Sequence, residues 1–220
     1  MHSSEQLTTR RPLKIRNHRL SQRCIQWLSQ KSITPNQISS FSLVLALGAG
    51  LCLLMSAQQS SYHSGWMIAA ALFIQARLLC NVLDGMLAIE GGKSTATGEL
   101  FNALPDRISD TIIMIAAGYS ILTVSWGETL GWLAAILAML TAYIRTLAIS
   151  IGAPANFSGP MARQQRMALL TIGCIVVAIE YYFWQHDYSM LIALIMMSIG
   201  CIWTILRRTY IAYHYLEKSH

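Results

Sequence analysis

Long apolar stretches alternate with short polar ones along most of this chain. Six apolar segments lie between about residue 37 and residue 207, and each is rich in Leu, Ile, Ala and Met. About 20 such residues are enough for a helix to cross the hydrocarbon core of a bilayer. We predict spans at about 37–55, 66–89, 98–124 and 129–151, a fifth that ends near 183 and a sixth that ends near 207.

The charges in the polar connections predict the orientation of these spans. The connections near 57–65, 125–128 and 184–189 contain no Lys or Arg, and the basic residues gather on the other side. Because cytoplasmic loops carry the excess of Lys and Arg, both termini are expected in the cytoplasm. The pattern therefore predicts an all-α polytopic membrane protein with six transmembrane helices, N-in and C-in.

Composition supports this class of protein. The chain of 220 residues is 54% hydrophobic and 12% charged, about half the charged share of a soluble domain. Seven of its sixteen Lys and Arg residues precede Pro35. We expect residues 1–34 to hold a cytoplasmic amphipathic juxtamembrane helix on anionic headgroups, residues 35–210 to form the six-helix membrane domain, and residues 211–220 to form a cytoplasmic tail. No base-reading module accompanies the basic segment, so we expect no nucleic-acid partner.

Acidic side chains gather between Asn81 and Asp110. Carboxylates at membrane depth are costly and survive mainly where they face a bundle interior or a watery cavity. Steps of three and four residues place the polar positions on one face of each helix. These positions are Arg77, Asn81, Asp84 and Ala88 on the second span, and Gly98, Asn102, Asp106 and Asp110 on the third.

Oxygen donors grouped in this way favour Mg²⁺ or Mn²⁺, which usually bridge protein carboxylates to substrate phosphates. Gly85 and Gly98 lack a Cβ, so a ligand can approach the backbone closely. The spacing alone does not distinguish phosphoryl chemistry from a cation transporter. A transporter would need polar residues along several spans near the midplane, whereas here they cluster at the cytoplasmic end.

The same window resembles the CDP-alcohol phosphatidyltransferase family, whose pattern is D-x2-D-G-x2-A-R-x8-G-x3-D-x3-D. The spacing is reproduced without a gap, and the resemblance extends over six spans to the TPN before the first. Asn81, Ile89 and Asn102 stand where the pattern has Asp, Arg and Asp. The matching positions are Asp84, Gly85, Ala88, Gly98 and Asp106.

The resemblance implies transfer of a phosphatidyl group from a CDP-alcohol, usually CDP-diacylglycerol, to a hydroxyl acceptor, with release of CMP, in phospholipid biosynthesis. It implies two Mg²⁺ or Mn²⁺ ions, a homodimer and an active site on the cytoplasmic face of a bacterial inner membrane. Asp106 would be the base and a metal ligand. The other implied metal ligands are Asp84, Asn81 and Asn102, and Asp110, one turn beyond the pattern, is a further candidate ligand. The substrate-binding residues are Gly85, Ala88 and Gly98, with Arg163 and Arg166 as candidates for the phosphate.

The departures from the pattern leave alternatives open. Two Asn residues attract a cation less strongly than two Asp residues, so fewer than two ions could bind. Asp110 can restore one charge, and a register that pairs it with Asp106 requires an insertion of one turn after Gly98. A non-catalytic relative that binds a CDP-lipid is the alternative function. The sequence leaves the acceptor alcohol open, as well as the choice between a lipid and a soluble donor.

Other charged residues have simpler explanations. Arg77 is expected to pair with an acidic residue inside the bundle, and Arg145 either lines the pocket or extends to the interface. Positive charge in a cytoplasmic loop is the alternative explanation for Arg163 and Arg166. We expect the acidic and histidine side chains at the outer end, Glu180, His186 and Asp187, to face water.

Overall fold

The computed structural model describes residues 35–90 and 96–219, and the described chain is almost entirely helical. A short 3-10 turn, η2 (Ser60–Tyr62), separates the first two long helices. Within the described ranges there is no strand, which confirms the predicted all-α class. The predicted interfacial helix in residues 1–34 lies outside the described residues. The long helices are α2 (Pro35–Gln58), α3 (His63–Glu90), α4 (Ala96–Tyr119), α5 (Gly127–Ser150), α6 (Arg163–Trp184) and α7 (Tyr188–Ser219).

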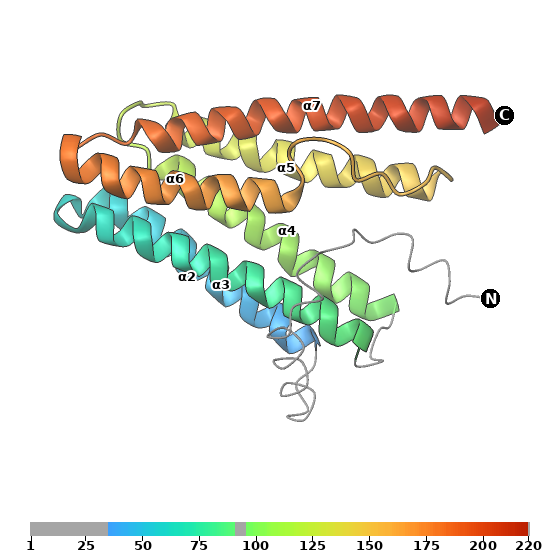
Figure 1. Ribbon diagram of the computed structural model, residues 1–220, viewed down its shortest axis with the longest axis horizontal. Helices are drawn as coiled ribbons and strands as arrows, with labels where there is room; N and C mark the ends of the chain where they lie inside the picture. The colour runs from blue at the N-terminus through green and yellow to red at the C-terminus, as the bar shows by residue number, and fades with distance from the viewer. Residues whose placement is uncertain (1–34, 91–95, 220) are drawn as a thin grey trace.

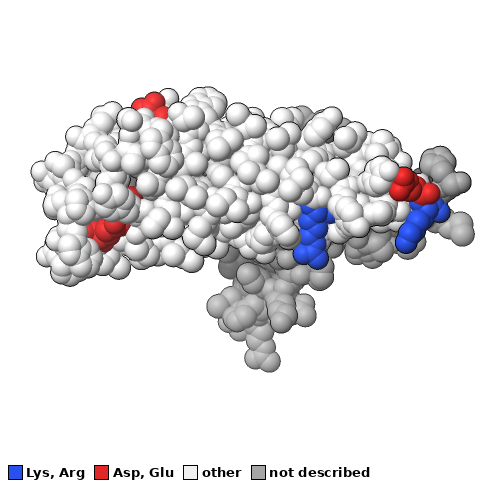
Figure 2. Space-filling model, turned by 90° about the horizontal axis from the view of Figure 1, so that it is seen from above, with Lys and Arg blue, Asp and Glu red and all other residues white. Residues whose placement is uncertain are grey.

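Most of these helices have the length and apolar character of membrane spans. In the described part of the chain, α2, α3, α5, α6 and α7 are long and apolar enough to cross a bilayer. The sixth long helix, α4, contains acidic residues and Pro105. Figure 2 shows one face of the molecule, and most of it carries neither acidic nor basic side chains. A span count of six and the N-in, C-in orientation stay predictions.

The six long helices form a closed ring. Helix α2 packs against α3 and α4, α4 against α5, α5 against α7, α7 against α6, and α6 back against α3. In Figure 1, α7 runs past the other helices toward the C-terminus. The inward faces are lined mainly by Ala, Met, Leu and Cys. The ring brings α6 close to α3 and α4, which lie far from it in the sequence.

Two helix boundaries differ from the prediction. Helix α4 ends at Tyr119, so the connection to α5 is longer than the predicted 125–128. Helix α7 continues to Ser219, beyond the predicted end near 207 and through most of the predicted tail. The end of the apolar stretch therefore did not predict where α4 or α7 ends.

The expectation that Asp187 faces water is wrong. Its side chain is buried, and its carboxylate accepts hydrogen bonds from the backbone N–H groups of Leu122 and Thr123 and from the Thr123 hydroxyl. Leu122 and Thr123 lie in the connection after α4, where no helical carbonyl accepts their N–H groups, so the Asp187 carboxylate supplies the acceptor. The Glu180 carboxylate accepts the backbone N–H of Tyr188 at 3.2 Å, at the start of α7. Both acidic residues therefore hold backbone N–H groups at the end of the bundle where α6 connects to α7.

Helices α4 and α5 approach each other closely through glycines. A Cβ on Gly118 would lie 2.6 Å from the Cα of Gly131 and 2.7 Å from the carbonyl oxygen of Gly127. We therefore expect Gly118→Ala to lower stability by about 1–3 kcal/mol, the usual cost of overpacking. Thermal unfolding of the purified protein in detergent measures this.

Gly65→Ala is the matched control, because a Cβ at Gly65, in α3, meets no atom within 4 Å. Gly65 lies in the first turn of α3, where alanine is expected to gain at most the roughly 0.5–1 kcal/mol that it gains over glycine in a helix interior. The control is therefore expected to unfold at the wild-type temperature or above. Equal unfolding temperatures for the two variants would mean that α4 and α5 separate without cost.

Candidate active site

The site is built around the guanidinium group of Arg163, the first residue of α6. Four side-chain oxygens from α3 and α4 converge on it. Both oxygens of Asp106 accept from its terminal nitrogens, and Oδ1 of Asp110 lies 3.4 Å from its Nε. The fourth is the amide oxygen of Asn81, 2.6 Å from Nη2, with the amide oriented so that its NH₂ group donates to Asp106 at 3.0 Å. Arg163 therefore occupies a site built to hold a cation.

A second ion-pair cluster lies deeper, around Asp110. Nη2 of Arg77 lies 2.7 Å from Oδ1 of Asp110, and Nη2 of Arg166 lies 3.4 Å from Oδ2. Arg77 is 0% exposed and Asp110 is 4% exposed. Arg77 also donates to the backbone carbonyl of Asp106 at 3.1 Å. The prediction that Arg77 pairs with an acidic residue is confirmed.

Asp84 lies one turn from Asn81 on α3 and is 1% exposed. Its carboxylate accepts a hydrogen bond of 2.8 Å from the Ser39 hydroxyl on α2. At Gly85, a Cβ would meet nothing within 4 Å. The structure thus brings Asn81 and Asp106 into contact and holds Asp84 on the same helix face as Asn81.

Part of the predicted donor set cannot be compared with the structure. The side chains of Ala88 and Asn102, and the surroundings of Gly98, lie outside the described residues although the backbones are helical. Among the described residues, no three His, Cys, Asp or Glu side chains gather closely enough to hold a metal ion. Among the predicted donors whose side chains are described, Asn81 offers an amide oxygen beside the carboxylate of Asp106.

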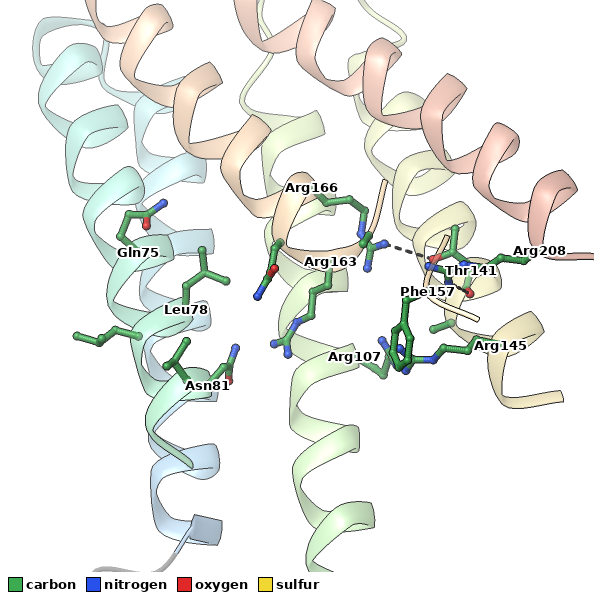
Figure 3. A pocket seen from close by; sticks show the side chains of 15 residues that line it. Gln75, Leu78, Asn81, Arg107, Thr141, Arg145, Phe157, Arg163, Arg166 and Arg208 are labelled. Carbon is green, nitrogen blue, oxygen red and sulfur yellow. Dashed lines mark hydrogen bonds between the residues drawn. The ribbon is translucent and has the colours of Figure 1, made fainter. Parts of the chain in front are cut away.

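A basic cavity of about 680 Å³ opens beside this acidic cluster. Its arginines come from four helices, and none of its lining residues within 35–90 and 96–219 is acidic. Figure 3 shows Arg107 and Arg145 beside Phe157, and Arg163 between α6 and the helix that carries Asn81. The lining arginines are Arg107, Arg145, Arg163, Arg166 and Arg208.

Uncharged groups fix several of these arginines in place. Arg166 donates to the carbonyl oxygen of Met161 at 2.9 Å and to Oγ1 of Thr141 at 3.3 Å. Arg208 donates to the carbonyl oxygens of Thr141 at 2.7 Å and Ser158 at 3.0 Å. The guanidinium carbon of Arg145 lies 5.3 Å from the centre of the Phe157 ring, within cation–π range. Arginines held in this way form a preorganised site for an anion.

The sequence pointed to Arg163 and Arg166 as candidate phosphate-binding residues, and both line the cavity. It did not point to Arg208 or Phe157, which line the same cavity. A signal for Arg208 was present in the chain. Buried residues recur on α7 at steps of four and three, and Arg208 continues the row formed by Met190, Leu194, Met197, Cys201 and Thr204. Its neighbour Arg207 lies off this row and is exposed.

Comparison with known proteins shows to which family the chain belongs. A family model described as CDP-alcohol phosphatidyltransferase matches residues 32–206. The chain belongs to the CDP-alcohol phosphatidyltransferase family. The match covers every residue of the acidic cluster and the cavity except Arg208.

The chain is similar to two proteins from other organisms. The chain is 30% identical over 182 residues to the inner membrane protein YnbA of Escherichia coli, which covers 83% of this chain and 85% of the relative. It is 28% identical over 159 residues to archaetidylinositol phosphate synthase of Methanothermobacter thermautotrophicus, covering 71% and 75%. The protein is accordingly an integral membrane phosphatidyltransferase of phospholipid biosynthesis, and the prediction of an enzyme is confirmed.

Solved structures share the fold. The phosphatidylinositol phosphate synthase of Mycobacterium tuberculosis with CDP-DAG bound superposes with a TM-score of 0.75 at 18% identity, covering 89% of this chain and 94% of that one. The same enzyme in complex with manganese and citrate gives 0.74 at 18% identity, covering 88% of each chain. At this identity the similarity concerns the arrangement of the helices.

Proposed function

We propose that this phosphatidyltransferase uses CDP-diacylglycerol as donor and an alcohol that itself carries a phosphate group as acceptor. The observation that carries the proposal is the cavity beside Asp106, whose described lining contains five arginines and no acidic residue. Arginine binds phosphate through two parallel hydrogen bonds, so such a cavity favours a phosphate monoester over an uncharged alcohol.

The oxygens around Arg163 support a divalent cation in this site. They already surround one cation, the guanidinium group, and carboxylate and amide oxygens suit Mg²⁺ and Mn²⁺. We assign Asp84, Asp106 and Asn81 as the residues that hold one ion, with Asn102 as a further candidate. When bound, the ion would neutralise the donor's pyrophosphate and stabilise the negative charge of the leaving CMP.

Asp110 has a different role in this proposal from the one expected of a metal ligand. Both of its oxygens face guanidinium groups, from Arg77 and Arg163 on one side and from Arg166 on the other. We infer that Asp110 holds the arginines in position. Because its negative charge is then neutralised by arginines, it is not available to bind a second metal ion, and the site is expected to hold one ion.

Asp106 is suited to act as the base. Its side chain is 16% exposed, whereas Asp110 behind it is closed off. The acceptor's hydroxyl oxygen attacks the phosphorus atom that bears the diacylglycerol, and the bond from this phosphorus to the CMP oxygen breaks. The hydroxyl proton passes to the Asp106 carboxylate. The cavity arginines hold the acceptor's own phosphate group, so that its hydroxyl faces the donor.

The relatives' names favour the same class of acceptor. One relative is an archaetidylinositol phosphate synthase, and the solved neighbour with CDP-DAG bound is a phosphatidylinositol phosphate synthase. Both names describe products with a phosphorylated inositol head group. We propose a phosphorylated polyol for this chain, with the site facing the cytoplasm of a bacterial inner membrane. Assembly as a homodimer stays a prediction.

CMP release by the purified full-length protein tests this function. The assay supplies CDP-diacylglycerol and Mn²⁺ or Mg²⁺, and compares inositol phosphate and glycerol phosphate with inositol, glycerol and serine. We expect release only with the phosphorylated acceptors. We also expect Arg145→Gln to raise the KM for the acceptor roughly tenfold, because a charge-assisted bond is lost.

Arg207→Gln is the matched control, since it removes the same charge from the exposed side of α7. It is expected to keep the wild-type KM. Equal rates with inositol and inositol phosphate would show that the cavity does not select for phosphate. Binding of the CDP-lipid without CMP release, whatever the acceptor, would identify a non-catalytic relative.

A further inference from the structure

Arg163 lies on the boundary between the acidic cluster and the basic cavity. Its guanidinium group contacts Asp106, Asp110 and, in the amide orientation given above, Asn81, and the same residue lines the cavity. Its side chain is 23% exposed, so one part of it is accessible from the cavity. It is therefore placed to interact with ligands on either side.

Arg163 is held differently from the neighbouring arginines. Arg77 and Arg166 are almost fully buried, and each also donates to a backbone carbonyl oxygen. Each hydrogen bond of Arg163 within residues 35–90 and 96–219 goes to the side chain of Asp106, Asp110 or Asn81. Its position therefore depends on the charge of the acidic cluster.

The distribution of charge makes Arg163 and a metal ion competitors. Asp110 keeps Arg77 and Arg166 as partners when Arg163 leaves, whereas Asp106 has Arg163 as its nearest cationic partner among the described residues. A divalent ion on the same oxygens would meet the positive guanidinium group at close range, where the repulsion is strong. Because both Asp106 oxygens already accept from Arg163, the two cations compete for the same carboxylate.

We propose that Arg163 is an internal counter-cation, which neutralises Asp106 in the metal-free enzyme and turns to the acceptor's phosphate group when a divalent ion binds. The proposal rests on the proposed function, because it needs both the cation site and the phosphate cavity. Each ligand then removes an obstacle for the other. By thermodynamic reciprocity, the phosphate tightens binding of the ion by the same factor as the ion tightens binding of the phosphate.

Titration of the full-length protein in detergent with Mn²⁺, followed by electron paramagnetic resonance of the free ion, tests this coupling. The probes are Mn²⁺ alone and Mn²⁺ with glycerol phosphate, and neither requires turnover. Without the phosphate, Arg163→Gln is expected to bind Mn²⁺ roughly tenfold more tightly than wild type, because a charge-assisted contact no longer competes. Glycerol phosphate is expected to tighten Mn²⁺ binding in wild type but not in Arg163→Gln.

Two further variants make the titration decisive. Arg163→Lys retains the charge and is expected to bind Mn²⁺ more weakly than Arg163→Gln, whereas Arg207→Gln, on the exposed side of α7, is expected to match wild type. Equal Mn²⁺ affinity in wild type and Arg163→Gln would overturn the proposal and leave the cation site intact. The proposal also fails if the phosphate effect persists in Arg163→Gln. Absence of Mn²⁺ binding in every variant would overturn the cation site, and the proposal with it.

Discussion

Asp106→Asn is expected to lower the kcat of CMP release by roughly 10²–10⁴-fold, the usual contribution of a positioned general base. The substitution keeps the shape of the side chain but removes the charge and the ability to accept a proton. The amide oxygen can still accept a bond from Arg163, so the bundle is expected to remain folded. Initial rates with CDP-diacylglycerol and the best acceptor measure the effect, and a thermal unfolding curve establishes the fold.

Glu217→Gln provides the matched control for this loss of one carboxylate. Glu217 is exposed on α7, where it accepts a hydrogen bond from Tyr213. Its variant is expected to retain the wild-type kcat. If Asp106→Asn also retained activity, another group would have to take the acceptor's proton, and the assignment of the base would be wrong.

Asp110→Asn is expected to have the largest effect on stability, a loss of about 3–5 kcal/mol, because it removes one partner from a buried ion pair. The guanidinium group of Arg77, which is 0% exposed, would keep its charge while losing a carboxylate 2.7 Å away. Arg166 would lose its contact with the same group. Unfolding by denaturant in mixed micelles, compared with wild type, measures the loss.

Replacing both members of the pair separates this explanation from a simple packing defect. The double variant Arg77→Met with Asp110→Leu leaves no unpaired charge between these two positions. Exchange of a buried ion pair for apolar residues is often neutral or stabilising. We expect the double variant to be more stable than Asp110→Asn, with a clear coupling term in the double-mutant cycle. An Asp110→Asn protein as stable as wild type would show that Arg77 finds other partners or water.

The helices could be predicted from the sequence because a bilayer imposes a simple rule on apolar length. The rule identifies the segments but not their ends. Helix α4 ends at Tyr119, and just beyond it the N–H groups of Leu122 and Thr123 donate to the buried carboxylate of Asp187, far along the chain. Such a contact across the fold has no local signal. Beyond the apolar stretch of the last span, α7 continues as a polar helix to Ser219.

The site was predictable to the extent that its residues recur at helical spacing. Asn81, Asp106 and Asp110 lie together as their spacing on α3 and α4 indicates. What spacing cannot predict is which cation the carboxylates face, since this depends on where α6 begins. The three arginines that meet Asp110 come from α3 and α6. The pairing of Arg77 with an acidic residue was predicted, but only the packing of α6 shows that Arg163 and Arg166 also neutralise these carboxylates.

The closed ring has a consequence for biosynthesis. Among the long helices of the described chain, α4 is the one that is not apolar enough to count as a membrane span. It emerges from the ribosome before α6. Until α6 arrives, Asp110 has Arg77 of α3 as a partner, but Asp106 lacks its nearest cationic partner, Arg163. An acidic group without its partner is costly in lipid. Stable insertion of α4 therefore depends on a segment translated more than forty residues later. During translation α4 would rest near the translocon or at the membrane surface, and arrival of α6 would complete its insertion.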